Sequence, residues 1–254
     1  MVRIVKPAVV SRGARSRAAE RISVGTLVFL CLVLMHPVGA RTETALLRQD
    51  FQALLSPVNL GLGVLGIGAA GIAHQWDDQL SGEVGENAVL QGALDLGNVY
   101  GSNTYGVSTT LGLWSLAKLT HRPQLQAVSS ELLRALVLAN ALVTPVKLAV
   151  GRERPDGSNN LSFPSGHAAN AFAMTTVLSR RYGRGAGIPL YAFAVLVPVA
   201  RIHHQRHFFS DVIGGGLLGT IAGCAVTRQQ EEGGLTWAPA YTSSGWLLQT
   251  QWRL

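Results

Sequence analysis

Apolar residues in this chain fall into long runs separated by short polar stretches, a pattern that predicts a bundle of helices. Residues 54–73 form the first long run, whose 20 residues contain no charge, so it is long enough to cross a bilayer. Its many glycines would equally suit a helix packed closely inside a bundle. Residues 74–103 are polar and rich in turn residues. Later runs repeat at helical steps of three and four, which predicts helices at residues 104–117, 131–150, 165–182, 188–202 and 208–227.

The predicted fold class is therefore all-α, a bundle of about five or six helices that is embedded in a membrane or associated with one. Residues 235–254 break the helical pattern, because their aromatic and apolar residues alternate partly with a period of two. Alternation of this kind is typical of strands. This aromatic tail is predicted to be short and irregular or β-like.

The N-terminus has the three-part pattern of a secretory signal. A basic arm occupies residues 1–21, an apolar run of 14 residues follows at 22–35, and the small residues Val38, Gly39 and Ala40 come next. Small residues at this point are typical of a signal-peptidase site. Residues 1–40 are thus predicted to be a signal peptide, with an uncleaved signal anchor as the alternative. The rest divides into a helical domain at 41–234 and the aromatic tail.

Composition strengthens the membrane interpretation. Hydrophobic residues make up 48% of the 254 residues and charged residues only 14%, whereas about 25% of an average soluble domain is charged. The net charge of +7 is concentrated in the N-terminal arm. The other basic residues form no stripe with interleaved aromatics, which argues against nucleic acid as a partner. Cys31 and Cys224 both lie in apolar runs, so no disulfide is expected.

Three polar clusters between residues 147 and 211 carry the candidate chemistry. The first contains Lys147 and Arg154, seven residues apart and followed by Pro155. A guanidinium grips phosphate oxygens with two parallel hydrogen bonds, and an ammonium adds a mobile charge. Two solvated charges at a helix end are the alternative interpretation of this cluster.

The second cluster, Pro164-Ser165-Gly166-His167, precedes a predicted helix. A helix N-terminus presents unpaired backbone N–H groups and the positive end of the dipole, so it favours an anion. Gly166 would let the backbone approach that anion closely. The alternative is an ordinary N-cap at Ser165, with His167 on the surface.

The third cluster contains Arg201, His207 and Asp211. His207 and Asp211 are four residues apart, so on a helix they would share one face. A carboxylate on Nδ1–H fixes the tautomer of an imidazole and leaves Nε2 free to attack. The alternatives are a surface pair and a metal site from His203, His204 and His207, which the neighbouring arginines disfavour by repelling a cation.

Together the clusters resemble the signature of the type 2 phosphatidic acid phosphatase superfamily, which includes lipid phosphate phosphatases, bacterial nonspecific acid phosphatases and vanadium haloperoxidases. That signature is Lys, six residues, Arg-Pro; then Pro-Ser-Gly-His; then Ser-Arg, five residues, His, three residues, Asp. The resemblance extends over about residues 90–227 and departs at Ala200, where the family has Ser. The matching positions are Lys147, Arg154, Pro155, Pro164, Ser165, Gly166, His167, Arg201, His207 and Asp211.

The resemblance implies a role for each residue. His207 would be the nucleophile that forms a phosphohistidine, Asp211 would orient it, and His167 would be the general acid. The family needs no metal and no other cofactor. This agrees with the physics of phosphoryl transfer, which depends mainly on positioning and charge neutralisation. The phosphoryl oxygens would be bound by Lys147, Arg154, Ser165, Gly166 and Arg201.

The predicted function is a phosphatase that hydrolyses lipid phosphate monoesters or diphosphates, such as phosphatidate or a polyprenyl diphosphate. The apolar helices around the clusters favour a lipid substrate. Three alternatives remain open: a soluble periplasmic nonspecific acid phosphatase, a vanadate-dependent haloperoxidase and a non-catalytic relic. Ala200 is the only support for the last of these.

The predicted location is a bacterial cell envelope, either the inner membrane with a periplasm-facing site or the periplasm itself. Two predicted helices separate the loops at 151–164 and 203–207, so both loops would lie on one face. A cleaved signal followed by spans at both 54–73 and 104–117 would give the wrong orientation, so at least one of them is expected not to span if the protein is embedded. The opposite face would be cytoplasmic by the positive-inside rule, because it carries Lys118, Arg122, Arg180, Arg181 and Arg184.

Overall fold

The computed structural model describes residues 40–80, 88–231, 235–242 and 245–252. The predicted signal segment, apart from residue 40, lies outside the described residues. The chain separates into two compact units, Met1–Leu46 and Leu47–Leu254. Of the first unit, the structure describes only the beginning of helix α2 (Ala40–Leu54).

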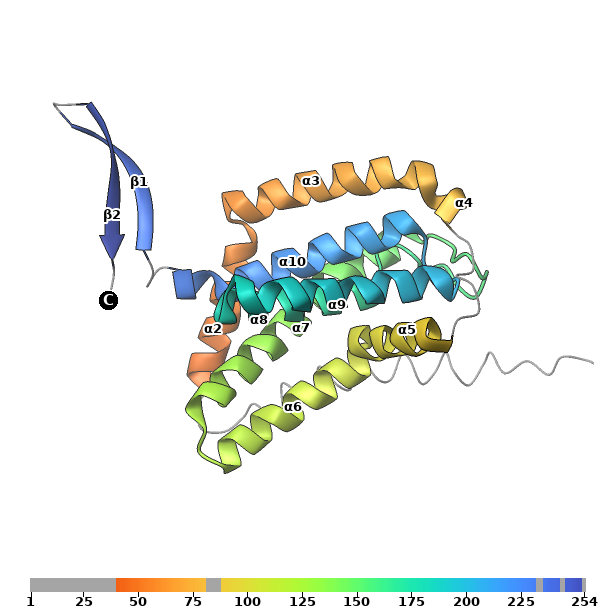
Figure 1. Cartoon of the computed structure of the whole chain (residues 1–254), viewed down its shortest axis with the longest axis horizontal. Coiled ribbons are helices and arrows are strands. Elements are labelled where there is room, and N and C mark those ends of the chain that lie inside the picture. Colours follow the sequence, from red (N-terminus) through yellow and green to blue (C-terminus); the bar gives the residue numbers. More distant parts are fainter. Residues whose placement is uncertain (1–39, 81–87, 232–234, 243–244, 253–254) are drawn as a thin grey trace, which may run out of the picture. The chain divides into compact units, whose positions relative to one another are not determined.

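The described part of the second unit is a helical bundle (Figure 1), as the apolar runs predict. All six predicted helices are present. Helices α2, α4 and α5 come in addition, and α4 and α5 lie in the stretch that was expected to be turn-rich. The elements are α3 (Pro57–Ala73), η1 (His74–Trp76), α4 (Asp77–Leu80), α5 (Ala88–Gly101), α6 (Asn103–Leu119), α7 (Pro123–Val150), α8 (Gly166–Tyr182), α9 (Arg184–His203) and α10 (Phe209–Glu231).

Local signals explain where several helices begin and end. Ser56 caps α3 by accepting a hydrogen bond from the backbone N–H of Asn59 at 3.4 Å, and Pro57 takes the first position, where a missing N–H costs nothing. Helix α7 begins at Pro123 rather than at residue 131 for the same reason. It ends at Gly151, whose φ of 59° is left-handed and therefore favours glycine.

Helix α8 lies in the core and packs against α7, α9 and α10. Its small side chains Ala168, Ala169, Ala171 and Ala173 have no exposed surface. Glycines of α10 bring the two backbones close: a Cβ atom at Gly219 would lie 2.1 Å from the carbonyl oxygen of Ala169. Small residues at such a contact are typical of close helix packing in membranes.

The chain is a membrane protein. Four described stretches are long and apolar enough to cross a bilayer: Pro57–Leu80, Pro123–Val150, Arg184–His203 and Phe209–Arg228. Helix α6, with 17 residues, is not among them. Large apolar side chains on α3 face outward, including Val64 and Ile67, which are 72% and 78% exposed. A bilayer would cover such a surface, whereas water would not favour it.

The C-terminal tail forms a β-hairpin. Strands β1 (Leu235–Thr242) and β2 (Gly245–Trp252) pair antiparallel, with Leu235 opposite Trp252 and Thr242 opposite Gly245. The predicted β-like character of the tail is confirmed.

Candidate active site

The two loops that carry the polar clusters meet at one end of the bundle. The backbone N–H of Asp156, after α7, donates to the carbonyl oxygen of Gln205, after α9, at 3.1 Å. The side chain of Arg206 also pairs with the carboxylate of Asp156 at 2.8 Å. The prediction that these loops lie on the same face is confirmed.

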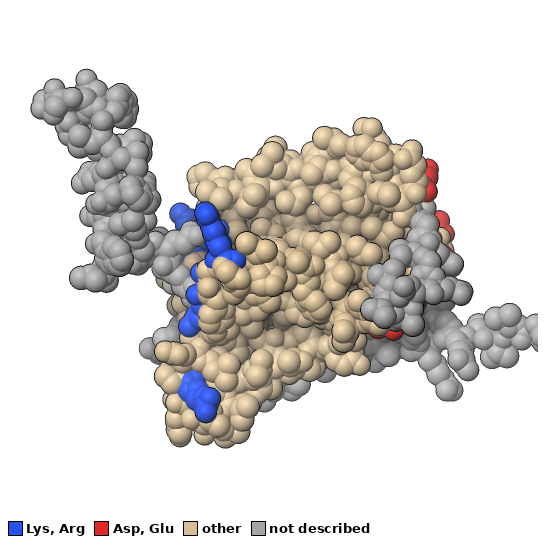
Figure 2. Space-filling model, viewed as in Figure 1, with Lys and Arg blue, Asp and Glu red and all other residues tan. Residues whose placement is uncertain are grey.

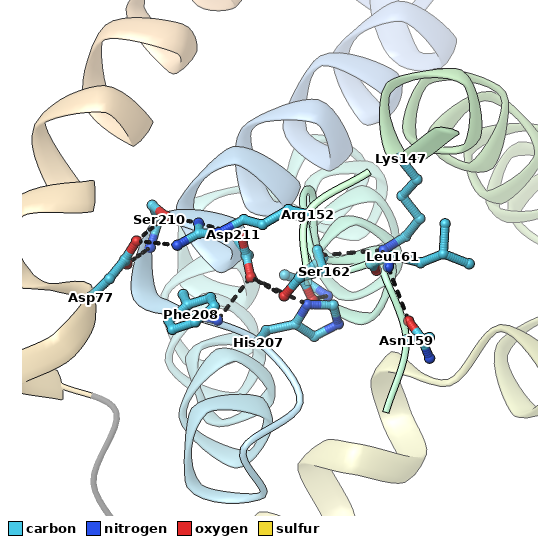
Figure 3. Close-up of polar contacts among 12 residues, drawn as sticks. Asp77, Lys147, Arg152, Asn159, Leu161, Ser162, His207, Phe208, Ser210 and Asp211 are labelled. Carbon is cyan, nitrogen blue, oxygen red and sulfur yellow. Dashed lines mark hydrogen bonds and ion pairs between the residues drawn. The ribbon is translucent and has the colours of Figure 1, made fainter. Parts of the chain in front are cut away.

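Lys147 and Arg154 reach the site from the end of α7. Because α7 ends at Val150, Lys147 lies in its last turn, while Arg154 lies in the following loop. The Lys147 ammonium donates to the carbonyl oxygen of Leu161 at 2.7 Å, which folds the loop back over the helix end (Figure 3). The backbone N–H of Arg154 donates to the carbonyl oxygen of Asn159 at 3.0 Å.

The second cluster forms the start of α8. Ser165 is the N-cap, and its hydroxyl accepts from the N–H of Ala168 at 3.4 Å. Ser165 is fully buried, so this is not a surface cap. A Cβ atom at Gly166 would lie 4.0 Å from Lys147 Cε, which places the lysine stem beside the first residue of the helix. The N-terminal amides of α8 and the first cluster therefore face one region.

His207 is buried behind this region, with 2% of its surface exposed. The spacing predicted that His207 and Asp211 share a helix. This prediction is wrong, because α10 begins only at Phe209. The Nδ1 atom of His207 nevertheless lies 3.7 Å from Asp211 Oδ2, which is too long for a hydrogen bond but close enough for an electrostatic contact. Asp211 accepts hydrogen bonds on Oδ2 from the Ser162 hydroxyl at 2.5 Å and the Phe208 N–H at 2.8 Å.

The pKa of His207 depends on its burial and on the charges around it. The pKa of His207 is lowered from 6.5 to about 3: burial is the largest cause, Asp211 opposes it, and Lys147, Arg154 and Arg201 lower the pKa as well. Loss of water disfavours the charged imidazolium, and nearby cations repel it. Burial and the three cations thus both favour the neutral form of the His207 ring, in which one nitrogen keeps a free lone pair.

His167 has the same surroundings. Burial lowers the pKa of His167 well below 6.5, and the next causes are Arg201, His207, Arg154 and Lys147. The same three cations thus act on both imidazoles. The tertiary fold brings these five residues together, although they come from a span of 61 positions between 147 and 207.

Arg201 lies in the last turn of α9 and is 7% exposed. Its Nη1 donates to the side-chain oxygen of Asn98 on α5 at 2.5 Å. Ala200, which stands where the family has Ser, is fully buried in the same helix. The arginine is therefore held from α5, an element that the sequence did not predict.

Three further residues of the site were missed by sequence reasoning: Arg152, Ser162 and Asp77. Arg152 contacts Asp211 and Asp77, each at 2.8 Å. Its position between Lys147 and Arg154 was a usable signal, since it is another cation in the same loop. Asp77 carried no such signal, because it lies 70 residues before Lys147 in a polar stretch.

The alternative of a metal site gains no support. Among the residues that the structure describes, no group of three or more His, Cys, Asp or Glu side chains could hold a metal ion. The rings of His203 and His204 contact each other, with centroids 5.0 Å apart and planes tilted by 55°, whereas His207 is buried next to Asp211.

Comparison with known proteins agrees with the motif pattern. Residues 130–234 match the PAP2 superfamily model, a range that contains every candidate site residue of the three clusters. The part of the chain that holds the three clusters is therefore similar to the PAP2 superfamily. The resemblance to the type 2 phosphatidic acid phosphatases is thereby confirmed.

Two relatives are phosphatases by name. A lipid A 1-phosphatase of Porphyromonas gingivalis is 36% identical over 91 residues, which cover 35% of this chain and 20% of that protein. A decaprenylphosphoryl-5-phosphoribose phosphatase of Mycobacterium tuberculosis is 37% identical over 101 residues, which cover 35% of this chain and 54% of that protein. This chain therefore spans about a fifth and about half of the two relatives.

Two solved structures are also similar. The crystal structure of Aquifex aeolicus LpxE has 23% sequence identity and a TM-score of 0.48, and the match covers 62% of this chain and 93% of that one. A transmembrane PAP2-type phosphatidylglycerolphosphate phosphatase from Bacillus subtilis has 19% identity and a TM-score of 0.33, with 83% and 96% covered.

Proposed function

We propose that this protein is a metal-independent phosphatase that hydrolyses lipid phosphate monoesters or diphosphates through a phosphohistidine on His207. One observation carries the proposal: Lys147, Arg154 and Arg201 all act on the imidazole of His207, which is only 2% exposed, and favour its neutral form. Three cations neutralise the spread negative charge of a transferring phosphoryl group. The neutral ring supplies the lone pair that attacks phosphorus.

The proposed reaction has two steps in which atoms and charges balance. First, Nε2 of His207 bonds to phosphorus, the bond from phosphorus to the lipid oxygen breaks, and His167 gives that oxygen a proton. Second, water bonds to phosphorus, the bond from phosphorus to Nε2 of His207 breaks, His167 takes a proton from the water, and inorganic phosphate leaves. Ser165 and the Gly166 N–H, at the N-terminus of α8, would hold phosphoryl oxygens throughout.

Apolar surroundings support a lipid substrate. A cavity of about 320 Å³ lies between α8, α9 and α10 and is lined by Phe172, Ile202 and Phe209 among others. A second cavity of about 310 Å³ is lined by residues of α5, α6, α7 and α8. Both are almost wholly apolar, and residues of the first cavity directly flank Arg201 and Ser210. The two named relatives act on lipid-linked phosphates, as their names state.

The charge distribution supports a site that faces the periplasm from the inner membrane. Figure 2 shows Lys and Arg gathered at one end of the bundle and Asp and Glu at the other. The basic end holds the connections between α6 and α7 and between α8 and α9, and the site loops lie at the opposite end (Figure 1). Basic connections stay in the cytoplasm, which would leave the site outside.

A substrate panel tests the proposed function. Purified protein in detergent is expected to release phosphate from phosphatidate and polyprenyl diphosphate with a higher kcat/KM than from a water-soluble monoester such as p-nitrophenyl phosphate. The lipid chain would add binding energy from the apolar cavities. Equal or greater kcat/KM for the soluble ester would favour a nonspecific acid phosphatase instead, and no release from any substrate would contradict the function.

Anion binding is expected to take up a proton. A bound dianion offsets the cations around His167 and so raises its pKa from the depressed value of the free site. The complex then holds more protons than the free protein, and binding weakens as pH rises between these two pKa values. The measurement is inhibition by sulfate, which keeps its charge over pH 5–9. Its Ki is expected to rise by up to about tenfold per pH unit.

The control for this pH dependence is His167→Gln, which cannot take up the proton. Its sulfate Ki is expected to be nearly flat over the same range. A flat profile in the unaltered protein would contradict the assignment of His167 as the group that becomes protonated in the complex.

A further inference from the structure

Arg152 joins two buried carboxylates that lie far apart in the sequence (Figure 3). Its Nη1 donates to Asp211 Oδ1 at 2.8 Å and its Nη2 donates to Asp77 Oδ2 at 2.8 Å. The two carboxylate side chains are 0% and 3% exposed, and the arginine is 22% exposed. Buried acids are stable only when they are paired and hydrogen-bonded, so one guanidinium serves both.

Asp77 holds this arginine from a separate element. Besides Arg152, Asp77 accepts from the backbone N–H of Ser210 at 2.8 Å, the Ser210 hydroxyl at 2.7 Å and His74 Nδ1 at 2.6 Å. The Ser210 hydroxyl in turn accepts from Arg152 Nη1 at 2.7 Å. Asp77 thereby ties α4 to the first turn of α10, the turn that also carries Asp211.

Asp211 is satisfied without a proton from His207. Arg152 occupies Oδ1, and Ser162 and the Phe208 N–H occupy Oδ2. The Phe208 ring packs against the Arg152 guanidinium, with 4.1 Å from Cζ to the ring centroid. The guanidinium therefore neutralises the carboxylate that stands 3.7 Å from His207 Nδ1, and its planar fork fixes the orientation of that carboxylate.

We propose that Arg152, clamped by Asp77, is a positioning residue of the phosphoryl-transfer site: it fixes and neutralises Asp211, so that His207 stays neutral and aimed at phosphorus. The proposal rests on the proposed function. Arg152 acts through Asp211 and touches no reacting atom. Without it, a buried and unpaired carboxylate would stand beside the imidazole and favour its protonation.

Other charges around His207 act in the opposite direction. They are Lys147 from α7, Arg154 from the following loop and Arg201 from α9, and all three disfavour the imidazolium. His167 from α8 also faces His207. Asp211 favours the protonated ring of His207. Neutralisation of Asp211 by Arg152 therefore decides whether the neutral or the protonated ring is favoured.

The test compares Arg152→Gln with the unaltered protein on a lipid phosphate. We expect kcat to fall by about 10- to 100-fold, as when the hydrogen-bonded partner behind a metal ligand is removed, with little change in KM. The acid limb of the kcat/KM profile should move to higher pH, because the charge of Asp211, no longer neutralised by Arg152, stabilises the imidazolium. Arg152→Lys should restore the acid limb and part of kcat, since an ammonium keeps the charge but not the fork.

Two further variants separate the effect of the position of Arg152 from the effect of its charge. Asp77→Asn loosens Arg152 but leaves its charge on Asp211, so kcat should fall without an upward shift of the acid limb. Arg181→Gln is the matched control: it removes an arginine of 21% exposure that pairs with Glu131 at 2.8 Å near the end of α8. It should change stability without changing kcat or the pH profile.

Each outcome decides the proposal. A folded Arg152→Gln protein with unaltered kcat and acid limb would overturn it, and a rise in KM alone would mean direct substrate contact. If Arg152→Gln does not fold, Arg152→Lys and Asp77→Asn decide, and wild-type kinetics in both would overturn it. An unaltered protein that releases no phosphate would instead refute the proposed function itself.

Discussion

Replacing His207 by alanine is expected to abolish phosphate release, by roughly 10³-fold or more. The bond between phosphorus and its Nε2 forms in the first proposed step and breaks in the second, and its Nδ1 lies 3.7 Å from Asp211. The measurement is phosphate release from phosphatidate in detergent micelles. Rapid quenching in alkali with a ³²P-labelled substrate should trap label on the unaltered protein and none on His207→Ala, because phosphohistidine survives alkali.

Two companion variants make this result specific. His121→Ala alters a histidine in the connection between α6 and α7, away from the site, and should keep full activity. His167→Ala should slow the hydrolysis of lipid phosphates far more than that of p-nitrophenyl phosphate. An alkoxide must be protonated as it leaves, whereas a nitrophenolate need not be. Retained activity in His207→Ala, or label that persists in it, would contradict the nucleophile assignment.

Gly215→Ala is expected to destabilise the protein and disable the site at once. A Cβ atom at this position would lie 2.2 Å from the carbonyl oxygen of Ser165 and 3.0 Å from its carbonyl carbon. Both partners are backbone atoms, so α10 must move away from the start of α8. Overpacking of this kind costs about 1–3 kcal/mol and sometimes more. Thermal unfolding in detergent should show a lower midpoint, together with a large loss of kcat.

Gly216→Ala is the matched control for this prediction. A Cβ atom there would meet the ring of Phe172 at 3.5 Å, which is ordinary contact with a side chain. Alanine in a helix interior is about 0.5–1 kcal/mol more favourable than glycine, so stability should hold or rise. Equal behaviour of the two variants would mean that the close approach of α10 to Ser165 does not control the site.

Much of the fold could be predicted because apolar runs and capping residues are local signals. Ser165 caps α8 and Gly151 ends α7 where their residue types suggest. The first residue of α7 was misplaced because Pro123 begins that helix before its apolar pattern becomes clear. Helix α5 was missed because polar residues such as Asp95 and Asn98 interrupt its apolar positions.

The candidate site likewise has features that the sequence could predict and features that it could not. The order and spacing of Lys147, Arg154 and His207 were visible in the sequence, since motif spacing survives any arrangement of the helices. The partners of Asp211 were not visible, because hydrogen bonds between residues 77, 152, 162 and 211 depend on how distant elements dock. The expected placement of His207 on a helix was wrong because α10 begins two residues later.

The sequence by itself determined that this chain forms apolar helices, that three cationic and imidazole clusters punctuate them, and that these clusters match one superfamily. Run length, residue type and spacing are properties of the chain alone. Only the tertiary structure decided that the surroundings of His207 favour its neutral form and that Arg152 pairs with both Asp211 and Asp77. Burial and the distance between charges set both features, and neither quantity exists until the helices pack.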